Sequence, residues 1–400
     1  MINSKPSSCK IDIRTLLFYI VIVLTVLYDN TSNSFLVTIA SAVFVLSSFA
    51  ELLKLKTTKA TIFIICFVLW AALTLIWTVS YNISTVRFGT CFVLCILLIT
   101  MEGLSTSKVS NIVENSLMAY LIASLLLCFI TYQSLGEYSI LLMLGQTDRI
   151  GEDNLNTNML GKYFAIASVV TLYFFFEKKW KIMILPYIIL AVFVIMTRSR
   201  SALLSLVIGS TTYLVYYYRT HDNMKQLWKT MCVIALAIYG LSKLPIWGEA
   251  FYRITAMFDF FSGSHDYTAD ASSSMRETLL QAGLKAIPEN PLLGHGIGSS
   301  PAVVTAHLGA NYEGGDYFHN NYIQLLVETG FIGFTLFYMA IIIILRKLWN
   351  LRRESPLAVL LLSILAIFLF CDTNNTTYYH KVYMIFIGIS ILYIKKSQIQ

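Results

Sequence analysis

Residues 316–345 read DYFHNNYIQLLVETGFIGFTLFYMAIIIIL, and this stretch decides the kind of fold that the chain can adopt. From Tyr322 onward it is almost entirely apolar, and it is longer than the roughly 20 residues that a helix needs to cross a bilayer. Polar side chains stand directly before it, at His319, Asn320 and Asn321. We therefore predict a membrane-spanning helix with an imidazole and two amides at the membrane surface.

The composition of the whole chain extends this interpretation. Of the 400 residues, 57% are hydrophobic and 13% are charged, whereas soluble proteins have about 45–50% apolar and about 25% charged residues. The polar N-terminus leads into repeated apolar runs, so no cleavable signal peptide is expected. We predict an all-α, polytopic membrane helical bundle with roughly 12 transmembrane helices. Their expected positions are residues 15–28, 34–53, 60–79, 86–102, 117–135, 157–176, 181–197, 201–218, 229–246, 322–345, 356–372 and 378–394.

The positions of the basic residues orient this bundle. With a cytoplasmic N-terminus, most of the 29 Lys and Arg fall in cytoplasmic loops, as the positive-inside rule requires. We therefore expect a multi-pass protein of the bacterial inner membrane with both termini in the cytoplasm. The basic residues on the other side are richer in arginine, which suits bidentate binding of anions better than lysine. They are Arg87, Arg149, Lys162, Arg198, Arg200, Lys243, Arg253, Arg276, Lys285 and Lys381.

The loop lengths divide the chain into three parts. Residues 1–246 hold the first nine predicted transmembrane helices, and residues 322–400 hold the last three and a cytoplasmic C-terminus. Residues 247–321 lie between them and are the longest polar stretch of the chain. We expect these residues to form a periplasmic loop subdomain that contains short helices.

The large loop contains a segment with clear helix signals, SSSMRETLLQAGLKAIPENPLLGHGIG, at residues 272–298. Ser274 and Glu277 have the spacing of a capping box, which predicts a helix that begins at Met275. The prolines and glycines that follow end this helix in a tight turn. Arg276 would then lie in the first turn, where the helix dipole disfavours a cation unless an anion is close. The alternative is a surface arginine on an amphipathic helix.

A second polar motif precedes the apolar run. Asn320 or Asn321 is a suitable N-cap, which places His319 at the positive end of the helix dipole. A neutral imidazole is favoured there and can act as a general base. Glu328 lies inside the span, where an ionisable side chain is a candidate for function. The alternatives are an incidental hydrogen-bonding role for His319 and simple pairing of Glu328 with another span.

A third motif, TRSRSALL at residues 197–204, is a short outer turn between two apolar runs. Arg198 and Arg200 are held close together at the membrane surface, and two guanidinium groups with the neighbouring serines could clamp a phosphate. The alternative is that both arginines extend to water along the membrane interface.

Other classes of site are not expected. The histidines of the large loop, His265, His295 and His307, match no compact metal-ligand spacing, and no cysteine lies near them. Nucleotide-binding fingerprints are also missing from the sequence, so we predict neither a metal nor a cofactor. The net charge of +7 follows from the cytoplasmic loops and does not indicate nucleic-acid binding.

Taken together, TRSRSALL, SMRETLLQAGLKAIPENPLLGHGIG and HNNYIQLLVETGFIGF resemble the O-antigen ligase and O-antigen polymerase family. In that family an Arg-Ser-Arg-like turn, a periplasmic R…P-x-x-G-x-G stretch and an H-N…E-x-G-x-x-G helix occur in this order. The resemblance extends from Thr197 to Phe334. It implies a metal-independent membrane glycosyltransferase that uses a glycan on undecaprenyl pyrophosphate as its donor and acts on the periplasmic face.

The resemblance also implies roles for particular residues. His319 would take the proton from the acceptor hydroxyl, and Arg276 would act beside it and bind the pyrophosphate together with Arg198 or Arg200. Asn320 and Glu328 are expected to support the site.

The resemblance leaves the reaction open between two outcomes. A ligase passes the glycan to the lipid A-core acceptor of lipopolysaccharide, whereas a polymerase passes it to another lipid-linked repeat unit. We favour the ligase, because the motifs are clear here and the polymerases of the family are more divergent. A third alternative is a transporter of lipid-linked oligosaccharide, but the sequence shows few charges within its spans and no internal repeat.

Overall fold

The structure is a computed structural model, which describes residues 12–29, 31–52, 56–106, 111–134, 157–221, 223–230, 232, 271–309, 312 and 317–398. Throughout these ranges every regular element is a helix, which confirms the all-α prediction. Among the described residues, four segments are helical, long and apolar enough to cross a membrane. They are α5 (Tyr81–Gly103) with the 3₁₀ turn that follows it, α6 (Ile112–Ser134), α8 (Thr157–Phe176) and α15 (Asn321–Leu351).

Other helices occupy most of the remaining predicted spans. Each predicted span that falls in the described ranges coincides with a helix, whereas span 229–246 lies almost wholly outside them. These helices are α1 (Ile13–Tyr28), α2 (Ser34–Ser47), α3 (Phe49–Leu52), α4 (Lys59–Thr74), α9 (Ile184–Met196), α10 (Arg200–Thr220), α16 (Pro356–Cys371) and α17 (Lys381–Ser397). Two further helices, α13 (Ala271–Ala286) and α14 (Ser300–Leu308), come from the large loop.

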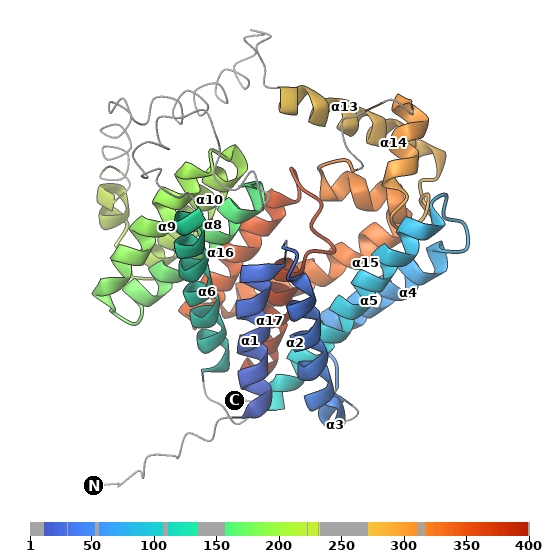
Figure 1. Ribbon diagram of the computed structural model, residues 1–400. Coiled ribbons are helices and arrows are strands. Elements are labelled where there is room, and N and C mark those ends of the chain that lie inside the picture. Colours follow the sequence, from blue (N-terminus) through green and yellow to red (C-terminus); the bar gives the residue numbers. More distant parts are fainter. Residues whose placement is uncertain are drawn as a thin grey trace.

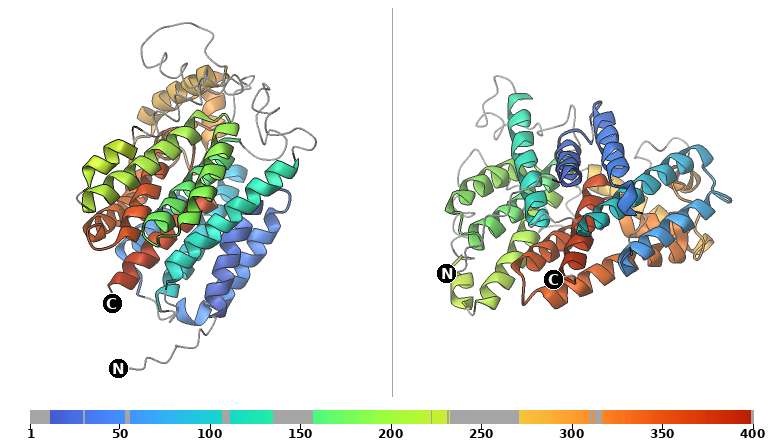
Figure 2. Two further views of the ribbon diagram at one scale, coloured as in Figure 1. Left: turned by 90° about the vertical axis from the view of Figure 1, so that its left-hand side faces the viewer. Right: turned by 90° about the horizontal axis from the view of Figure 1, so that it is seen from below.

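The helices form two groups joined by a central helix. In Figure 1, α8, α9, α10 and α16 lie on one side, and α4, α5 and α15 lie on the other. α17 runs between the groups and packs against α5, α15 and α16, while α1 and α2 pack together beside it. Figure 2 shows the same arrangement from the side and from below. α13 and α14 lie at the end of the bundle opposite to that where α1 begins and α17 ends (Figure 1).

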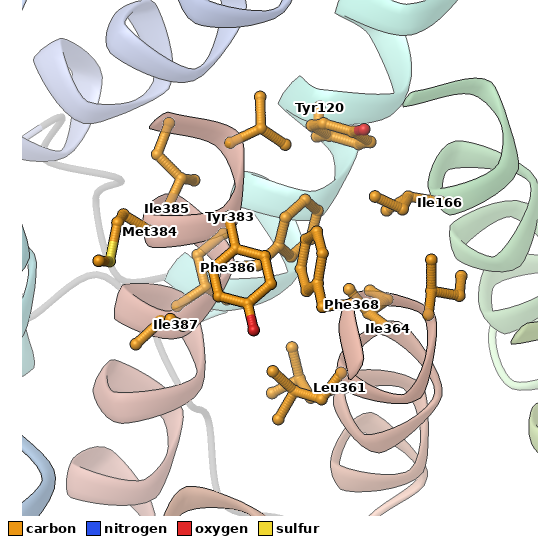
Figure 3. Packing of buried hydrophobic residues seen from close by; sticks show 14 of the residues in the cluster. Tyr120, Ile166, Leu361, Ile364, Phe368, Tyr383, Met384, Ile385, Phe386 and Ile387 are labelled. Carbon is orange, nitrogen blue, oxygen red and sulfur yellow. The ribbon is translucent and has the colours of Figure 1, made fainter. Parts of the chain in front are cut away.

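Aromatic and branched side chains fill the space where α6, α8, α16 and α17 meet (Figure 3). Phe386 of α17 meets the ring of Tyr120 at 4.9 Å between centroids, and Phe368 of α16 meets Tyr383 at 4.4 Å. Edge-to-face pairs of this kind add to the free energy of burying apolar area. The two groups of helices are therefore joined by a packed core.

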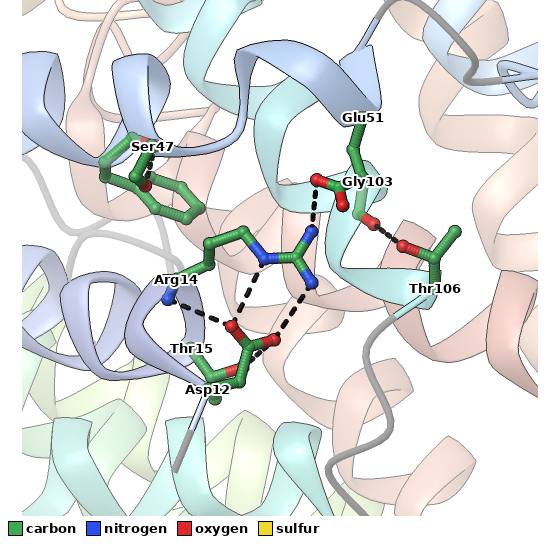
Figure 4. Close-up of polar contacts among 8 residues, drawn as sticks. Asp12, Arg14, Thr15, Ser47, Glu51, Gly103 and Thr106 are labelled. Carbon is green, nitrogen blue, oxygen red and sulfur yellow. Dashed lines mark hydrogen bonds and ion pairs between the residues drawn. The ribbon is translucent and has the colours of Figure 1, made fainter. Parts of the chain in front are cut away.

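Ion pairs mark the end of the bundle where α1 begins. Arg14 reaches Glu51 of α3 at 2.5 Å (Figure 4), and Lys395 reaches the fully buried Glu102 at 3.0 Å. At the other end, Lys381 pairs with Asp29 at 2.6 Å. Among the described residues, ion pairs therefore occur at both ends of the bundle, with Arg14 and Lys395 at one end and Lys381 at the other.

α15 is broken at the end of its first third, at Gly330. Gly330 has φ 64° and ψ −173°, a conformation that side chains disfavour strongly. A Cβ atom at this position would lie 2.1 Å from the carbonyl oxygen of Leu292. Glycine is required here because both the backbone conformation and the close approach exclude a side chain.

The loop after α13 pairs with the backbone groups that this break leaves without helical partners. Residues 291–296 and α15 each donate backbone hydrogen bonds to the other, and the indole of Trp70 in α4 donates to one more carbonyl of α15. The backbone groups at the buried break therefore have hydrogen-bond partners. The pairs are His295 N–H to Val327 O at 2.8 Å, Gly296 N–H to Glu328 O at 2.9 Å, Phe331 N–H to Pro291 O at 2.9 Å, Ile332 N–H to Leu292 O at 3.3 Å and Trp70 Nε1–H to Thr329 O at 2.8 Å.

Candidate active site

The helix that carries Arg276 differs from its prediction. α13 begins at Ala271, about a turn before Met275, because the residues ahead of Ser274 are also helical. Arg276 therefore lies inside the helix, and the prediction that it occupies an unfavourable first-turn position is wrong.

Packing orients Arg276 instead. Gly283 lies two helical turns further on the same face of α13, and a Cβ atom there would lie 2.4 Å from Ile323 and 3.0 Å from Phe318. This face therefore rests on the segment that carries His319. Arg276 is half-buried there and lies within electrostatic reach of the imidazole.

His319 occupies the entry to α15. Asn320 is the N-cap, as predicted, and its Oδ1 accepts from the N–H of Ile323 at 3.1 Å. His319 itself has φ 51°, a left-handed conformation that is uncommon outside glycine, and its ring lies 4.2 Å from the ring of Tyr317. The chain thus turns sharply at His319.

The surroundings of His319 favour its uncharged form. Burial, together with the positive charges of Arg276 and Lys162, lowers the pKa of His319 from 6.5 to about 4. Its Nδ1 is buried and finds no hydrogen-bond partner among the described residues. His319 is therefore a neutral imidazole near pH 7, able to accept a proton. The cause is burial and neighbouring cations rather than the helix dipole alone.

The loop between α16 and α17, residues 372–380, fixes the start of α15. This loop belongs to none of the three predicted motifs, although CDTNNTTYYHK at residues 371–381 is a polar run between two apolar spans. Hydrogen bonds from both asparagines that follow His319 tie the helix start to it. They join Asn321 N–H to Asp372 O at 2.7 Å, Thr377 N–H and Tyr378 N–H to Asn321 Oδ1 at 2.9 and 3.0 Å, and Asn320 Nδ2–H to Thr373 O at 3.2 Å.

The carboxyl group of Asp372 lies at the centre of this attachment. It is fully buried and accepts hydrogen bonds from the hydroxyl groups of Tyr338 at 2.9 Å, Tyr383 at 3.3 Å and Thr377. Tyr338 in turn accepts from Asn321 Nδ2 at 2.9 Å. Burial raises the pKa of Asp372 to about 7 despite these hydrogen bonds. Asp372 thus organises the polar groups beneath the entry to α15.

The arginine turn between α9 and α10 is held by α8. Ser199 caps α10 by accepting from Ala202 N–H at 3.3 Å, and its Oγ donates to Asn158 Oδ1 at 2.6 Å. A Cβ atom at Gly161 would lie 2.5 Å from the Ala202 side chain, so α8 and α10 pack without a gap. Arg198 is only 9% exposed and has φ 50°, whereas Arg200 is half-buried.

Glu328 lies deeper, just before the break in α15. It is fully buried and accepts from the hydroxyl of Tyr378 at 2.6 Å and from Gln324 Nε2 at 2.5 Å. Nearby, the guanidinium of Arg87 lies 3.5 Å from the centroid of the Tyr379 ring. Glu328 therefore joins α15 to the loop before α17.

The histidines of the large loop serve the loop itself where the structure describes them. His295 Nε2 and His307 Nε2 lie 3.8 Å and 3.3 Å from the carboxylate of Glu289, and His265 is outside the described residues. A separate cavity of about 530 Å³ opens on the face of α13 that points away from Arg276. It is lined by Ser274, Glu277, Thr278, Gln281, Ala282, Lys285, His307 and Leu308.

One family comparison covers the segments that build this site. Residues 185–338 match the family model described as O-antigen ligase. The chain carries a domain of the O-antigen ligase family. The matched residues include the Arg198 turn, all of α13 and the entry and break of α15. A search of curated proteins found no matching relative.

The match to the O-antigen ligase family indicates the general type of activity. The family consists of membrane enzymes of the glycosyltransferase type that act on lipid-linked glycans. Of the residues predicted for the site, Arg276 lies within electrostatic reach of His319. Lys162 of α8, which the sequence motifs do not include, also lies within electrostatic reach of the imidazole. The Arg198 turn contacts the same first turns of α8.

Proposed function

We propose that the protein is an O-antigen ligase that transfers a glycan from undecaprenyl pyrophosphate to the lipid A-core acceptor of lipopolysaccharide. The observation that carries this proposal is a half-buried, uncharged His319 within electrostatic reach of the guanidinium of Arg276, in residues that match the family. A base next to fixed cations suits the attack of a hydroxyl group on a carbon that bears an anionic leaving group.

In the proposed reaction, an acceptor hydroxyl attacks the anomeric carbon of the donor glycan. The new C–O bond forms as the bond to the pyrophosphate oxygen breaks, and the leaving group departs with the electron pair. His319 takes the hydroxyl proton, while Arg276 with Arg198 or Arg200 stabilises the charge on the pyrophosphate. Direct displacement inverts the configuration at the anomeric carbon. The pyrophosphate linkage is already activated, so the chemistry requires neither ATP nor a metal.

We further propose that this site faces the periplasm of a twelve-span protein in the inner membrane, with residues 247–321 as the extramembrane subdomain. The bias of basic residues toward the loops expected in the cytoplasm supports this orientation, and Arg14 and Lys395 lie at the opposite end of the bundle from Lys381. Both termini would then lie in the cytoplasm.

Reporter fusions test the orientation. A fusion after Gly309, which follows α14, should report the periplasm, and a fusion after Arg353, which follows α15, should report the cytoplasm. The expected difference follows from the charge bias of the loops. Alkaline phosphatase and green fluorescent protein fusions at both positions provide opposite readouts of the same junction. Reversed signals at both sites would place His319 in the cytoplasm and would exclude the proposed reaction.

The lipopolysaccharide profile of a deletion strain separates the ligase from a polymerase. For a ligase we expect loss of O-chains from the lipid A-core together with accumulation of long polymer on undecaprenyl pyrophosphate. Core that carries a single repeat unit would instead identify a polymerase, and lipid-linked repeats confined to the cytoplasmic face would identify a transporter. Complementation with the intact gene is the control for the profile.

A further inference from the structure

Lys162 is a buried lysine in the second turn of α8. Its side chain lies among the most enclosed charged groups of the described chain, with the residue 6% exposed. The ammonium group donates to Asn374 Oδ1 at 3.1 Å, and with the Asn375 amide turned to face it, Asn375 Oδ1 accepts at 2.7 Å. These acceptors are neutral amides, which compensate the burial of a charge less well than a carboxylate does.

Asp372 is the carboxylate that lies within electrostatic reach of Lys162. Its two oxygens already accept from Tyr338, Tyr383 and Thr377. The hydroxyl groups, rather than the ammonium group of Lys162, are thus the hydrogen-bond donors given for Asp372 among the described residues. A buried charge is costly, and one within a membrane span is a candidate for function.

The helix that carries Lys162 contacts two parts of the candidate active site, the arginine turn and the α16–α17 loop. Within the same turns of α8, Asn158 bonds Ser199 of the arginine turn and Gly161 packs against Ala202. Lys162 extends from these turns to the α16–α17 loop, which holds the start of α15. α8 thus bridges the arginine turn and the segment that orients His319.

The charged and titratable groups around Lys162 come from several elements. Arg276 of α13, Cys371 at the end of α16 and Asp372 face the ammonium group. Lys162 in turn acts on two imidazoles, His319 before α15 and His380 before α17, and lowers the pKa of each. Arg87 of α5 and Lys381 of α17 also act on His380.

We propose that Lys162 is a positioning residue for glycan transfer: its buried ammonium group holds a fixed positive charge beneath His319 and the donor pyrophosphate, and it fastens the α16–α17 loop to α8. The inference rests on the proposed function. A charge in a region of low dielectric acts over several ångströms without contact, and a charge fixed before the donor arrives costs no reorganisation during the reaction. The same charge keeps the base unprotonated and attracts the anionic donor.

Three substitutions separate the charge of Lys162 from its hydrogen bonds. Lys162→Met removes both, Lys162→Gln keeps a donor for Asn374 without charge, and Lys162→Arg keeps the charge. Lys285→Met is the matched control, because Lys285 lies at the same end of the bundle but lines the separate cavity of α13. Each full-length protein is purified, and its rate with undecaprenyl-pyrophosphate-linked glycan and acceptor is measured against pH, together with donor affinity.

The neutral variants should move the acid limb of the rate profile upward by about one pH unit, as expected when a nearby positive charge is removed. Donor Kd should rise about tenfold in both, whereas Lys162→Arg and Lys285→Met should keep the limb and the Kd of the parent. A purely structural role would lower the rate without moving the limb. An unmoved limb and an unchanged donor Kd in folded Lys162→Gln would overturn the inference.

The result is distinguishable from failure of the proposed function. If His319→Ala transfers glycan at the parental rate, His319 is not the general base, and the acid limb of the pH–rate profile reports the titration of another group. If His319→Ala is inactive but Lys162→Gln keeps the parental limb and donor affinity, the inference about Lys162 alone fails. Should Lys162→Met not fold, Lys162→Gln gives the same readouts with the contact to Asn374 retained.

Discussion

Replacing His319 with alanine should lower glycan transfer by about 10²- to 10⁴-fold, the usual contribution of a general base, while leaving donor binding intact. The protein should still fold, because the start of α15 is held by Asn320, Asn321 and their partners in the α16–α17 loop rather than by the imidazole. Donor binding should persist, since the pyrophosphate contacts are proposed to lie on arginines. The measurement is product formation and donor affinity of the purified variant with lipid-linked donor and acceptor.

The pH dependence of the unmodified enzyme checks the same assignment. Only the neutral imidazole accepts a proton, and the folded protein lowers the pKa of His319 to about 4. Transfer should therefore stay at its plateau as the pH falls through 6.5, the ordinary value for histidine, and should decline only as the pH approaches about 4. A limb near 6.5 would mean that a different group titrates. Loss of donor binding in His319→Ala would make His319 a pyrophosphate ligand, and unchanged turnover would remove it from the mechanism.

Exchange of Arg276 for lysine should reduce transfer by about 10²-fold, although the positive charge remains. A guanidinium binds two phosphate oxygens with a planar pair of N–H groups, whereas an ammonium group is a point charge on a flexible stem. The packing of α13 on the entry to α15 fixes the direction of this side chain, so a shorter reach or a different geometry is not readily compensated. The rate and the donor KM of purified Arg276→Lys measure the effect.

A reciprocal exchange on the same helix provides the control. Lys285→Arg changes the head group in the opposite sense on the face of α13 that lines the separate cavity, and it should leave transfer unchanged. Because Arg276→Lys keeps a cation near His319, the acid limb of the rate profile should stay where it is in the parent. Near-normal transfer by a stable Arg276→Lys protein would make Arg276 an ordinary surface residue.

The structural features that depend only on residues close together in the sequence could be predicted. The span after His319, the N-cap at Asn320 and the helix-ending turn after α13 all follow from local patterns, and the structure contains each of them. The predicted start of α13 at Met275 was wrong. A capping box marks one possible helix start, but it does not prevent the residues before it from being helical as well.

Contacts between distant segments could not be predicted in the same way. The attachment of Asn321 to Asp372, the bond from Lys162 to Asn374 and the pairing of Glu328 with Tyr378 join residues far apart in the chain. No pattern in either segment specifies its partner, since periodicity reveals which face is apolar but not what covers it. The polar run at residues 372–380 was the available signal, because a polar segment between two spans must satisfy its groups somewhere.

The break in α15 limits how the length of this chain can change in evolution. Each hydrogen bond across the break joins one particular residue of the 291–296 loop to one particular residue of α15. An insertion between Pro291 and Gly296 would shift some of these pairs out of register and leave backbone groups unpaired inside a buried helix. An insertion ahead of α13 would leave every pair as it is. Natural selection can therefore lengthen the chain on one side of α13 far more readily than on the other.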